Sequence, residues 1–193
     1  FTNLKILNNT VSSSSNSIIQ LGGNDEDVTF ENGLITGNHA PYSIINHSGE
    51  NYPKFINCTI TDNTVENDNN GMIYTSQANL FIINSILWNP GIREIRSTLY
   101  QNNNPTYGIN IGFSVIEEGQ SGISTNDWYD HVNWFDGIIE TAPAFVDPGN
   151  GDYHLSDISP CNGEGSAEYA PAFDVENNFR PNPEGSRPDI GAY

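Results

Sequence analysis

A cluster of aromatic and acidic side chains at residues 127–136 is the segment best suited to binding a ligand. It reads Asp-Trp-Tyr-Asp-His-Val-Asn-Trp-Phe-Asp. Aromatic faces stack on the C–H surfaces of sugars, while neighbouring carboxylates and amides bond sugar hydroxyls. We therefore predict a glycan site formed by Trp128, Tyr129, Asp130 and Trp134. The alternative is that these rings plug one end of the fold and exclude water from its core.

Acidic loops offer oxygen ligands for a metal ion. They occur at residues 25–27, 62–68 and 147–152. Oxygen side chains that converge from turns suit Ca²⁺, and we predict a structural calcium site with Asp147, Asn150 and Asp152 as its ligands. The alternative is that these side chains bond the backbone of their own turns. The four scattered histidines form no zinc-ligand pattern.

Residues that could cleave a polysaccharide are sparse. A glycoside hydrolase needs two carboxylates as acid and base or nucleophile, and a lyase needs a cation and a base beside the uronate. The Asn-Thr-Asp, Asp-Asp, Gly-His-Asp and Arg-Ile-Lys motifs of polygalacturonase-like enzymes do not occur. Among the six Lys and Arg, Lys54 precedes an expected strand, and residues 93–96 could place two arginines and Glu94 on a coil surface. We interpret these as solvated charges and predict no active site within this chain.

The charge balance excludes several classes of partner. Six basic against 24 acidic residues give a net charge of −18, which disfavours nucleic acid and anionic membrane surfaces. The longest apolar stretch, residues 80–88, is too short and too polar for membrane insertion. With 18 Gly and 11 Pro, the composition favours a turn-rich all-β protein over a helical bundle.

Two cysteines, Cys58 and Cys161, are too few for a disulfide framework. A single bridge between them would close a long loop. We favour the other interpretation, two small buried thiols.

A repeated template organises the chain. Residues 1–9, 30–38 and 55–63 each contain an aromatic, an Asn two places later, an apolar residue and a final Asn. A fourth copy at 82–89 is one residue shorter, and in a weaker fifth copy at 113–117 we expect Ser114 to take the place of the first Asn. The final Asn recurs at positions 9, 38, 63 and 89, at intervals of 29, 25 and 26 residues.

Units of this length with short β-branched and aromatic segments cannot bury their own apolar face. Stacking them, with each strand about 4.8 Å above its counterpart, does bury it. An Asn at the same corner of every coil can then form a hydrogen-bonded ladder. We predict an all-β parallel β-helix over residues 1–139 and an irregular C-terminal cap over 140–193 that closes an open end. A β-sandwich, the alternative, would not explain an Asn in fixed phase with the apolar positions.

The coils and the C-terminal motifs resemble a known family. The Phe-Ile-Asn-Cys-Thr-Ile-Thr-Asp-Asn coil at 55–63 resembles the right-handed parallel β-helix repeats of bacterial secreted and surface proteins. The Asp-Pro-Gly-Asn-Gly-Asp-Tyr-His-Leu stretch at 147–155 and Asp-Ile-Gly-Ala-Tyr at 189–193 are similar to the closing segment of choice-of-anchor Q domain proteins. Residues 140–143 and 162–165 depart from that family's pattern.

The resemblance implies an exported protein, secreted or on the cell surface, and the C-terminal part of a longer β-helix. We predict a non-catalytic, adhesin-like or glycan-binding module. Its expected partners are a glycan, an extracellular surface, or other parts of a longer chain or assembly. The alternative is the C-terminal fragment of a polysaccharide lyase or glycoside hydrolase whose catalytic coils lie upstream. A structural stalk that binds nothing is a third possibility.

Overall fold

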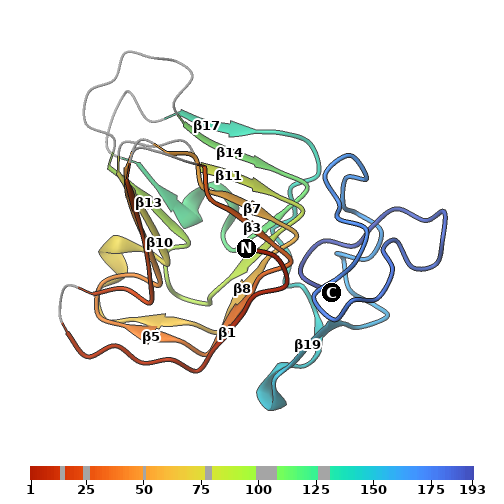
Figure 1. The fold of residues 1–193 in the computed structure, drawn as a ribbon, viewed down its shortest axis with the longest axis horizontal. Helices are drawn as coiled ribbons and strands as arrows, with labels where there is room; N and C mark the ends of the chain where they lie inside the picture. The colour runs from red at the N-terminus through yellow and green to blue at the C-terminus, as the bar shows by residue number, and fades with distance from the viewer. Residues whose placement is uncertain (14–15, 24–26, 50, 77–79, 99–107, 126–130) are drawn as a thin grey trace.

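Short strands follow one another around a common axis, and strands of successive coils lie one above the other (Figure 1). This computed structural model describes residues 1–13, 16–23, 27–49, 51–76, 80–98, 108–125 and 131–193. Strands of successive coils pair in parallel, in a continuous register from coil to coil. The chain forms a parallel β-helix, so the predicted all-β solenoid is confirmed.

The coils build three five-stranded parallel sheets. Sheet I contains β3 (Thr29–Glu31), β7 (Lys54–Ile56), β11 (Leu80–Ile83), β14 (Gly108–Gly112) and β17 (His131–Trp134). Sheet II contains β1 (Lys5–Leu7), β4 (Leu34–Thr36), β8 (Thr59–Thr61), β12 (Ile86–Trp88) and β15 (Val115–Ile116). Sheet III contains β2 (Ile19–Gly23), β6 (Ile45–Gly49), β10 (Ile73–Ser76), β13 (Ile95–Ser97) and β16 (Ile123–Ser124).

Smaller elements fill the corners. The short strands β5 (His39–Ala40) and β9 (Thr64–Val65) pair in parallel after sheet II. Two 3₁₀ turns, η1 (Asp68–Asn70) and η2 (Gly119–Gly122), lie between strands of sheets II and III. The corners are therefore built from short, polar, turn-forming segments, as the Asn- and Gly-rich sequence between the apolar stretches indicates.

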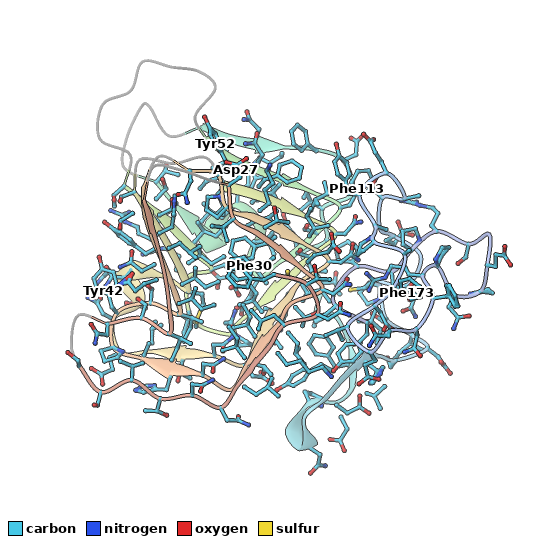
Figure 2. The ribbon with its side chains drawn as sticks, viewed as in Figure 1. Asp27, Phe30, Tyr42, Tyr52, Phe113 and Phe173 are labelled. Carbon is cyan, nitrogen blue, oxygen red and sulfur yellow. The ribbon has the colours of Figure 1, made fainter. Side chains whose placement is uncertain are left out.

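Equivalent apolar side chains form columns inside the coils. The rings of Phe30 and Phe55 stack with centroids 5.0 Å apart and planes 2° apart, which matches the about 4.8 Å spacing of paired strands. Phe1 extends this column at a centroid distance of 5.3 Å, and Ile82 pairs with Phe55 on its other side. Figure 2 shows Phe30 in the interior. Such columns bury the apolar surface that one coil alone would expose.

The first asparagine of each repeat lies at the corner between sheets I and II. The residues at this corner have φ values of 54°, 54°, 49° and 51° at Asn3, Asn32, Asn57 and Asn84. This left-handed conformation is one that asparagine adopts more readily than most residues with a Cβ. The turn geometry therefore explains why asparagine recurs here. We call these four residues the corner column.

In the fifth repeat, Phe113 and not Ser114 occupies the position of the corner asparagine. β12 and β15 pair Ile86 with Val115, so Phe113 stands opposite Asn84 and shares its left-handed conformation, with φ of 46°. Ser114 is the next residue and is buried inside the coil. The expected alignment is wrong by one residue, because the aromatic of this repeat lies at the corner and not in the interior.

The second asparagine of each repeat forms a continuous ladder inside the corner that follows sheet II. The backbone N–H and the Nδ2 of Asn38 both donate to Oδ1 of Asn63, at 3.1 and 2.9 Å. Asn9 donates to Asn38 in the same way, and Asn63 donates to Asn89. Nδ2 of Asn63 also donates to two backbone carbonyls of sheet II. The predicted asparagine ladder is confirmed.

The C-terminal segment, residues 140–193, lies beside the corner between sheets I and II, along the flank of the coils (Figure 1). It contains the antiparallel hairpin of β18 (Phe145–Asp147) and β19 (Asp152–Leu155), joined by the 3₁₀ turn η4 (Pro148–Asn150). We expected this segment to close an open end of the coils. It instead covers the outer face of sheet II, where Ile86 and Val115 pack against Ile190. Leu34, Ile86 and Val115 of that face are buried, so covering them removes more hydrophobic surface from water.

The corner column holds this segment by hydrogen bonds. Nδ2 of Asn57 donates to the carbonyls of Asp189 and Gly191 at 3.2 and 3.1 Å. Nδ2 of Asn84 donates to the carbonyl of Ser166 at 2.9 Å, and the Ser166 N–H donates back to Oδ1 of Asn84 at 2.7 Å. The same asparagines that form the turns therefore dock the C-terminal segment.

Arg180 ties this column to the last residues of the chain. Its Nη1 donates to Oδ1 of Asn32 at 2.9 Å, and its Nη2 donates to the carbonyls of Gly191 and Tyr193 at 3.1 and 2.8 Å. Desolvation lowers the pKa of Arg180, while the nearby Asp174 and other anionic groups oppose the shift. The guanidinium thus acts as a largely buried crosslink between coil and C-terminal segment.

Both cysteines are free and buried, as expected for two structural thiols. Burial raises the pKa of Cys58 to about 12 and that of Cys161 to about 11, so neither is a reactive thiolate at neutral pH. In the part of the chain that the structure describes, no helix has the length and apolarity needed to cross a membrane.

Replacing Asn63 with alanine should lower the free energy of unfolding by about 3 kcal/mol, since each buried polar group left unsatisfied costs about 1–3 kcal/mol. The change removes the acceptor of two N–H groups of Asn38. Urea unfolding followed by circular dichroism measures the loss. The control is the exposed Asn69, where alanine should change stability by less than about 0.5 kcal/mol. Equal effects of the two substitutions would contradict the ladder's role.

Replacing Arg180 with alanine should loosen the C-terminal segment and lower the free energy of unfolding by about 2–4 kcal/mol, because three acceptors lose a charged donor. Limited proteolysis should then cut within residues 140–193 faster than in the wild type. Arg187 is the matched control, because its contacts with the Glu164 carboxylate and with the carbonyls of Glu164 and Gly165 all lie within the C-terminal segment and do not reach the coils. Unchanged cleavage of the Arg180→Ala protein would refute the crosslink.

Candidate functional site

A groove of about 560 Å³ lies on the outer face of sheet I. This volume falls within the range of about 300–1,000 Å³ that is typical of ligand sites. Strands of three successive coils, two turns that precede strands of the sheet, and the C-terminal segment line it. The lining residues are Asp27, Tyr52, Lys54, Ile56, Phe81, Asn110 and Tyr169. Figure 2 shows Asp27 and Tyr52 close together where the strands of sheet I begin.

The floor of the groove consists of side chains that project outward from sheet I. Lys54 of β7 pairs with Phe81 of β11, which pairs with Asn110 of β14, so these three form one column. Ile56 lies two residues beyond Lys54 and shares its face. Nδ2 of Asn133, in the next coil, donates to Oδ1 of Asn110 at 2.9 Å. The floor therefore places a partly exposed aromatic ring between an ammonium and an amide.

The C-terminal segment contributes one wall, Tyr169. Its ring centroid lies 5.8 Å from that of Phe81, with the planes tilted by 58°, and the residue is 38% exposed. The hydrogen bonds between Asn84 and Ser166 fix the segment three residues before this ring. The groove is complete only when the C-terminal segment is docked on the coils.

An ion pair borders the groove where the strands of sheet I begin. Nζ of Lys54 lies 3.0 Å from Oδ2 of Asp27. Oδ1 of the same carboxylate accepts the backbone N–H of Tyr52 at 3.1 Å. Asp27 is therefore held by a donor on each oxygen, and the positive charge of Lys54 has a partner inside the site.

This arrangement suits recognition of a sugar better than cleavage of one. Phe81, Tyr169 and Tyr52 offer ring surfaces for C–H groups, while Asp27 and Asn110 offer polar atoms for hydroxyls. Among the described lining residues, Asp27 is the one carboxylate. Hydrolysis of a glycosidic bond needs two, about 5–10 Å apart.

Trp134, one of the predicted glycan-site residues, points into the coils. It packs against the main core cluster and pairs with Ile111 of β14, whereas Asn133 and Phe135 on either side of it are exposed. This placement matches the alternative that the aromatic cluster plugs the coils, and it does not bring Trp134 to the groove. Trp128, Tyr129 and Asp130 lie outside the described residues.

The predicted calcium ligands form local hydrogen bonds. Nδ2 of Asn150 donates to Oδ2 of Asp147 at 2.7 Å. Oδ1 of Asp152 accepts the backbone N–H of His154 and contacts its Nδ1 at 2.7 Å, and these contacts lower the pKa of Asp152. Within the described ranges, no three His, Cys, Asp or Glu side chains lie together in a way that could hold a metal ion. Calcium binding at this turn stays a prediction.

Glu94 is fully buried, so its interpretation as part of a surface charge cluster is wrong. Arg93 and Arg96 are partly exposed, as expected for solvated charges. Glu94 turns inward because it ends the asparagine ladder. Its Oε1 accepts the backbone N–H of Asn89, and its Oε2 accepts Nδ2 of Asn89 at 2.7 Å. The sequence Arg-Glu-Ile-Arg at 93–96 gave no sign of this role.

Burial raises the pKa of Glu94 to about 8, because desolvation outweighs the two hydrogen bonds from Asn89, which lower it. The nearby Glu117 raises it further, and the pKa of Glu117 is itself raised by desolvation. A carboxyl group with a pKa of about 8 holds its proton at neutral pH. The folded protein therefore carries a neutral acid in its interior.

The groove residues Ile56, Phe81 and Tyr169 were not among the predicted site residues. Alternation within β7 could have identified part of the groove, because Ile56 must face outward when Phe55 faces the core. The position of Tyr169 depends on how the C-terminal segment docks on the coils. No local pattern in the sequence carries that information.

Between about pH 4.5 and about pH 8 the free energy of unfolding should fall, because the unfolded chain releases the Glu94 proton in this range while the folded protein keeps it. A group whose pKa is raised on folding contributes its full stability below the unfolded value of 4.5 and loses it as the pH rises through about 8. Glu94→Gln should flatten this profile, although it sacrifices one hydrogen bond with Asn89. Denaturant titrations at a series of pH values test this. The control is a substitution at the exposed Glu184 of the C-terminal segment, which is not among the groups that act on Glu94, and Glu184→Gln should preserve the fall.

No protein-family model matches the chain, and neither a curated protein nor a solved structure shows significant similarity to it. The family that the repeats and the C-terminal motifs resemble therefore enters only as part of a proposal.

Proposed function

We propose that this protein is an exported, non-catalytic β-helix module that binds a glycan in the groove on sheet I. The observation that carries the proposal is the ring pair of partly exposed Phe81 and exposed Tyr169, at a centroid distance of 5.8 Å in a groove of about 560 Å³. Apolar rings beside hydrogen-bonding groups are the usual lining of a shallow ligand site. Export to the cell surface or medium is proposed from the family resemblance.

The groove is built on a rigid support, which favours binding. Lys54, Phe81 and Asn110 are fixed by parallel pairing of three consecutive strands, so their spacing does not change when a ligand arrives. Preorganised contacts lose less conformational entropy on association than flexible ones. The long axis of a glycan could extend along the column, with further contacts to Asn133 in the next coil.

The non-catalytic part of the proposal rests on the charged groups that line the groove. Asp27 and Lys54 pair with each other at 3.0 Å, and among the described lining residues there is no second carboxylate to complete the pair that glycoside hydrolysis needs. The alternative, a fragment of a lyase or hydrolase, requires catalytic groups on other coils. An adhesin-like role on an extracellular surface or within a larger assembly is compatible with the same groove.

Phe81→Ala and Tyr169→Ala should each weaken glycan binding about tenfold, since loss of a central aromatic contact costs more than about 1 kcal/mol. Binding is measured by calorimetry with the best probe from a panel of soluble β-glucans, xylans, mannans and methyl-esterified pectins. Phe179→Ala is the matched control, because Phe179 is an exposed aromatic, 76% accessible, of the same C-terminal segment outside the groove.

Two results would overturn the proposal. Wild-type affinity that survives both groove substitutions would place the ligand elsewhere. Release of reducing ends, or of unsaturated uronates detected by their absorbance, would favour the enzyme fragment. Binding without turnover, lost in Phe81→Ala and kept in Phe179→Ala, supports the module.

A further inference from the structure

We propose that the groove selects uncharged glycan segments and rejects carboxylated ones, because the ammonium of Lys54 already forms an ion pair with Asp27. The inference rests on the proposed glycan-binding function. It assigns the class of ligand and names the residue that sets the specificity.

Lys54 is the one cation among the described residues that line the groove. A uronate carboxylate would need this ammonium as its partner, but Nζ of Lys54 lies 3.0 Å from Oδ2 of Asp27. Asp27 is also anchored by the N–H of Tyr52 at 3.1 Å. A uronate that displaced Asp27 from Lys54 would replace one ion pair by another and leave the Asp27 carboxylate without its cation. A charged sugar therefore gains no net binding energy at this position.

The rest of the floor penalises an anion. Ile56 and the rings of Phe81 and Tyr169 cannot replace the water that a carboxylate would lose. The faces of aromatic rings carry partial negative charge, which favours C–H groups and disfavours anions. A neutral sugar ring places its C–H surface on the same rings without either cost.

The electrostatic field of the whole molecule also disfavours binding of an acidic glycan. The net charge is −18. Cationic side chains outside the groove are also paired with carboxylates. Lys5 contacts Glu176 at 3.3 Å, and Arg187 contacts Glu164 at 3.6 Å. An acidic polysaccharide therefore approaches against a repulsive potential, which salt screens over about 10 Å at 0.1 M.

The test compares matched probes that differ at C6, where one member of each pair carries a carboxylate and the other a neutral group. Fully methyl-esterified and de-esterified homogalacturonan form one pair, and cello-oligosaccharide with its C6-carboxylated form makes another. At 150 mM salt the wild type should bind the neutral member of a pair at least about tenfold more tightly, because the carboxylate loses hydration in the groove without gaining a charged partner.

Asp27→Asn should raise affinity for the carboxylated probe about tenfold by freeing Lys54, since one charge-assisted hydrogen bond becomes available. The asparagine keeps the oxygen that accepts the Tyr52 N–H, so the turn is preserved. The matched control is Asp157→Asn, an exposed carboxylate outside the groove. It changes net charge equally and should leave the preference intact. Repeating the series at 500 mM salt separates the local ion pair from the general field.

The outcomes distinguish the two proposals. If the wild type binds none of the probes, the glycan-binding function fails and this inference fails with it. If it binds the carboxylated member of a pair as well as or better than the neutral one, the function stands and the inference is wrong. Equal effects of Asp27→Asn and Asp157→Asn would also refute it, because selectivity would then come from net charge alone.

Discussion

The alignment of equivalent residues from coil to coil is the constraint on which the structure depends. Strands of three or so residues are too short to be stable in isolation, so each is stabilised by parallel pairing with the strands above and below it. Pairing fixes the register, and the register places Phe30 on Phe55 and Asn38 on Asn63. A shift by one residue would turn both the aromatic rings and the amides away from their partners.

Two sets of asparagines with different backbone and side-chain environments act at two corners. The corner column provides the left-handed turns and directs its amides outward, where Asn57 and Asn84 hold the C-terminal segment. The ladder directs its amides inward, where they satisfy backbone groups that water cannot reach. The candidate groove depends on the first set, because Tyr169 reaches Phe81 only when the C-terminal segment is docked.

The sequence was sufficient to predict the structural features that repeat from coil to coil. The fold class, the stacking and the ladder follow from residues that recur in phase, and asparagine at 9, 38, 63 and 89 indicates a shared corner. Features that occur once were not predictable in this way. The burial of Glu94, the flank position of residues 140–193 and the wall formed by Tyr169 each depend on contacts between distant parts of the chain. Phe113 shows the same limit inside a repeat, since an aromatic ring in a corner position breaks the pattern used for alignment.

Glu94 also bears on how such a protein could lengthen over evolutionary time. Both of its oxygens are taken by Asn89, a residue of the same coil only five positions earlier. Asn89 therefore donates its N–H groups to Glu94 and not to an asparagine of the next coil. An asparagine in a duplicated coil inserted after it would find no free donor to continue the row. The asparagine row can therefore gain members by repeat duplication only on the Asn9 side, although the coils themselves continue beyond Glu94.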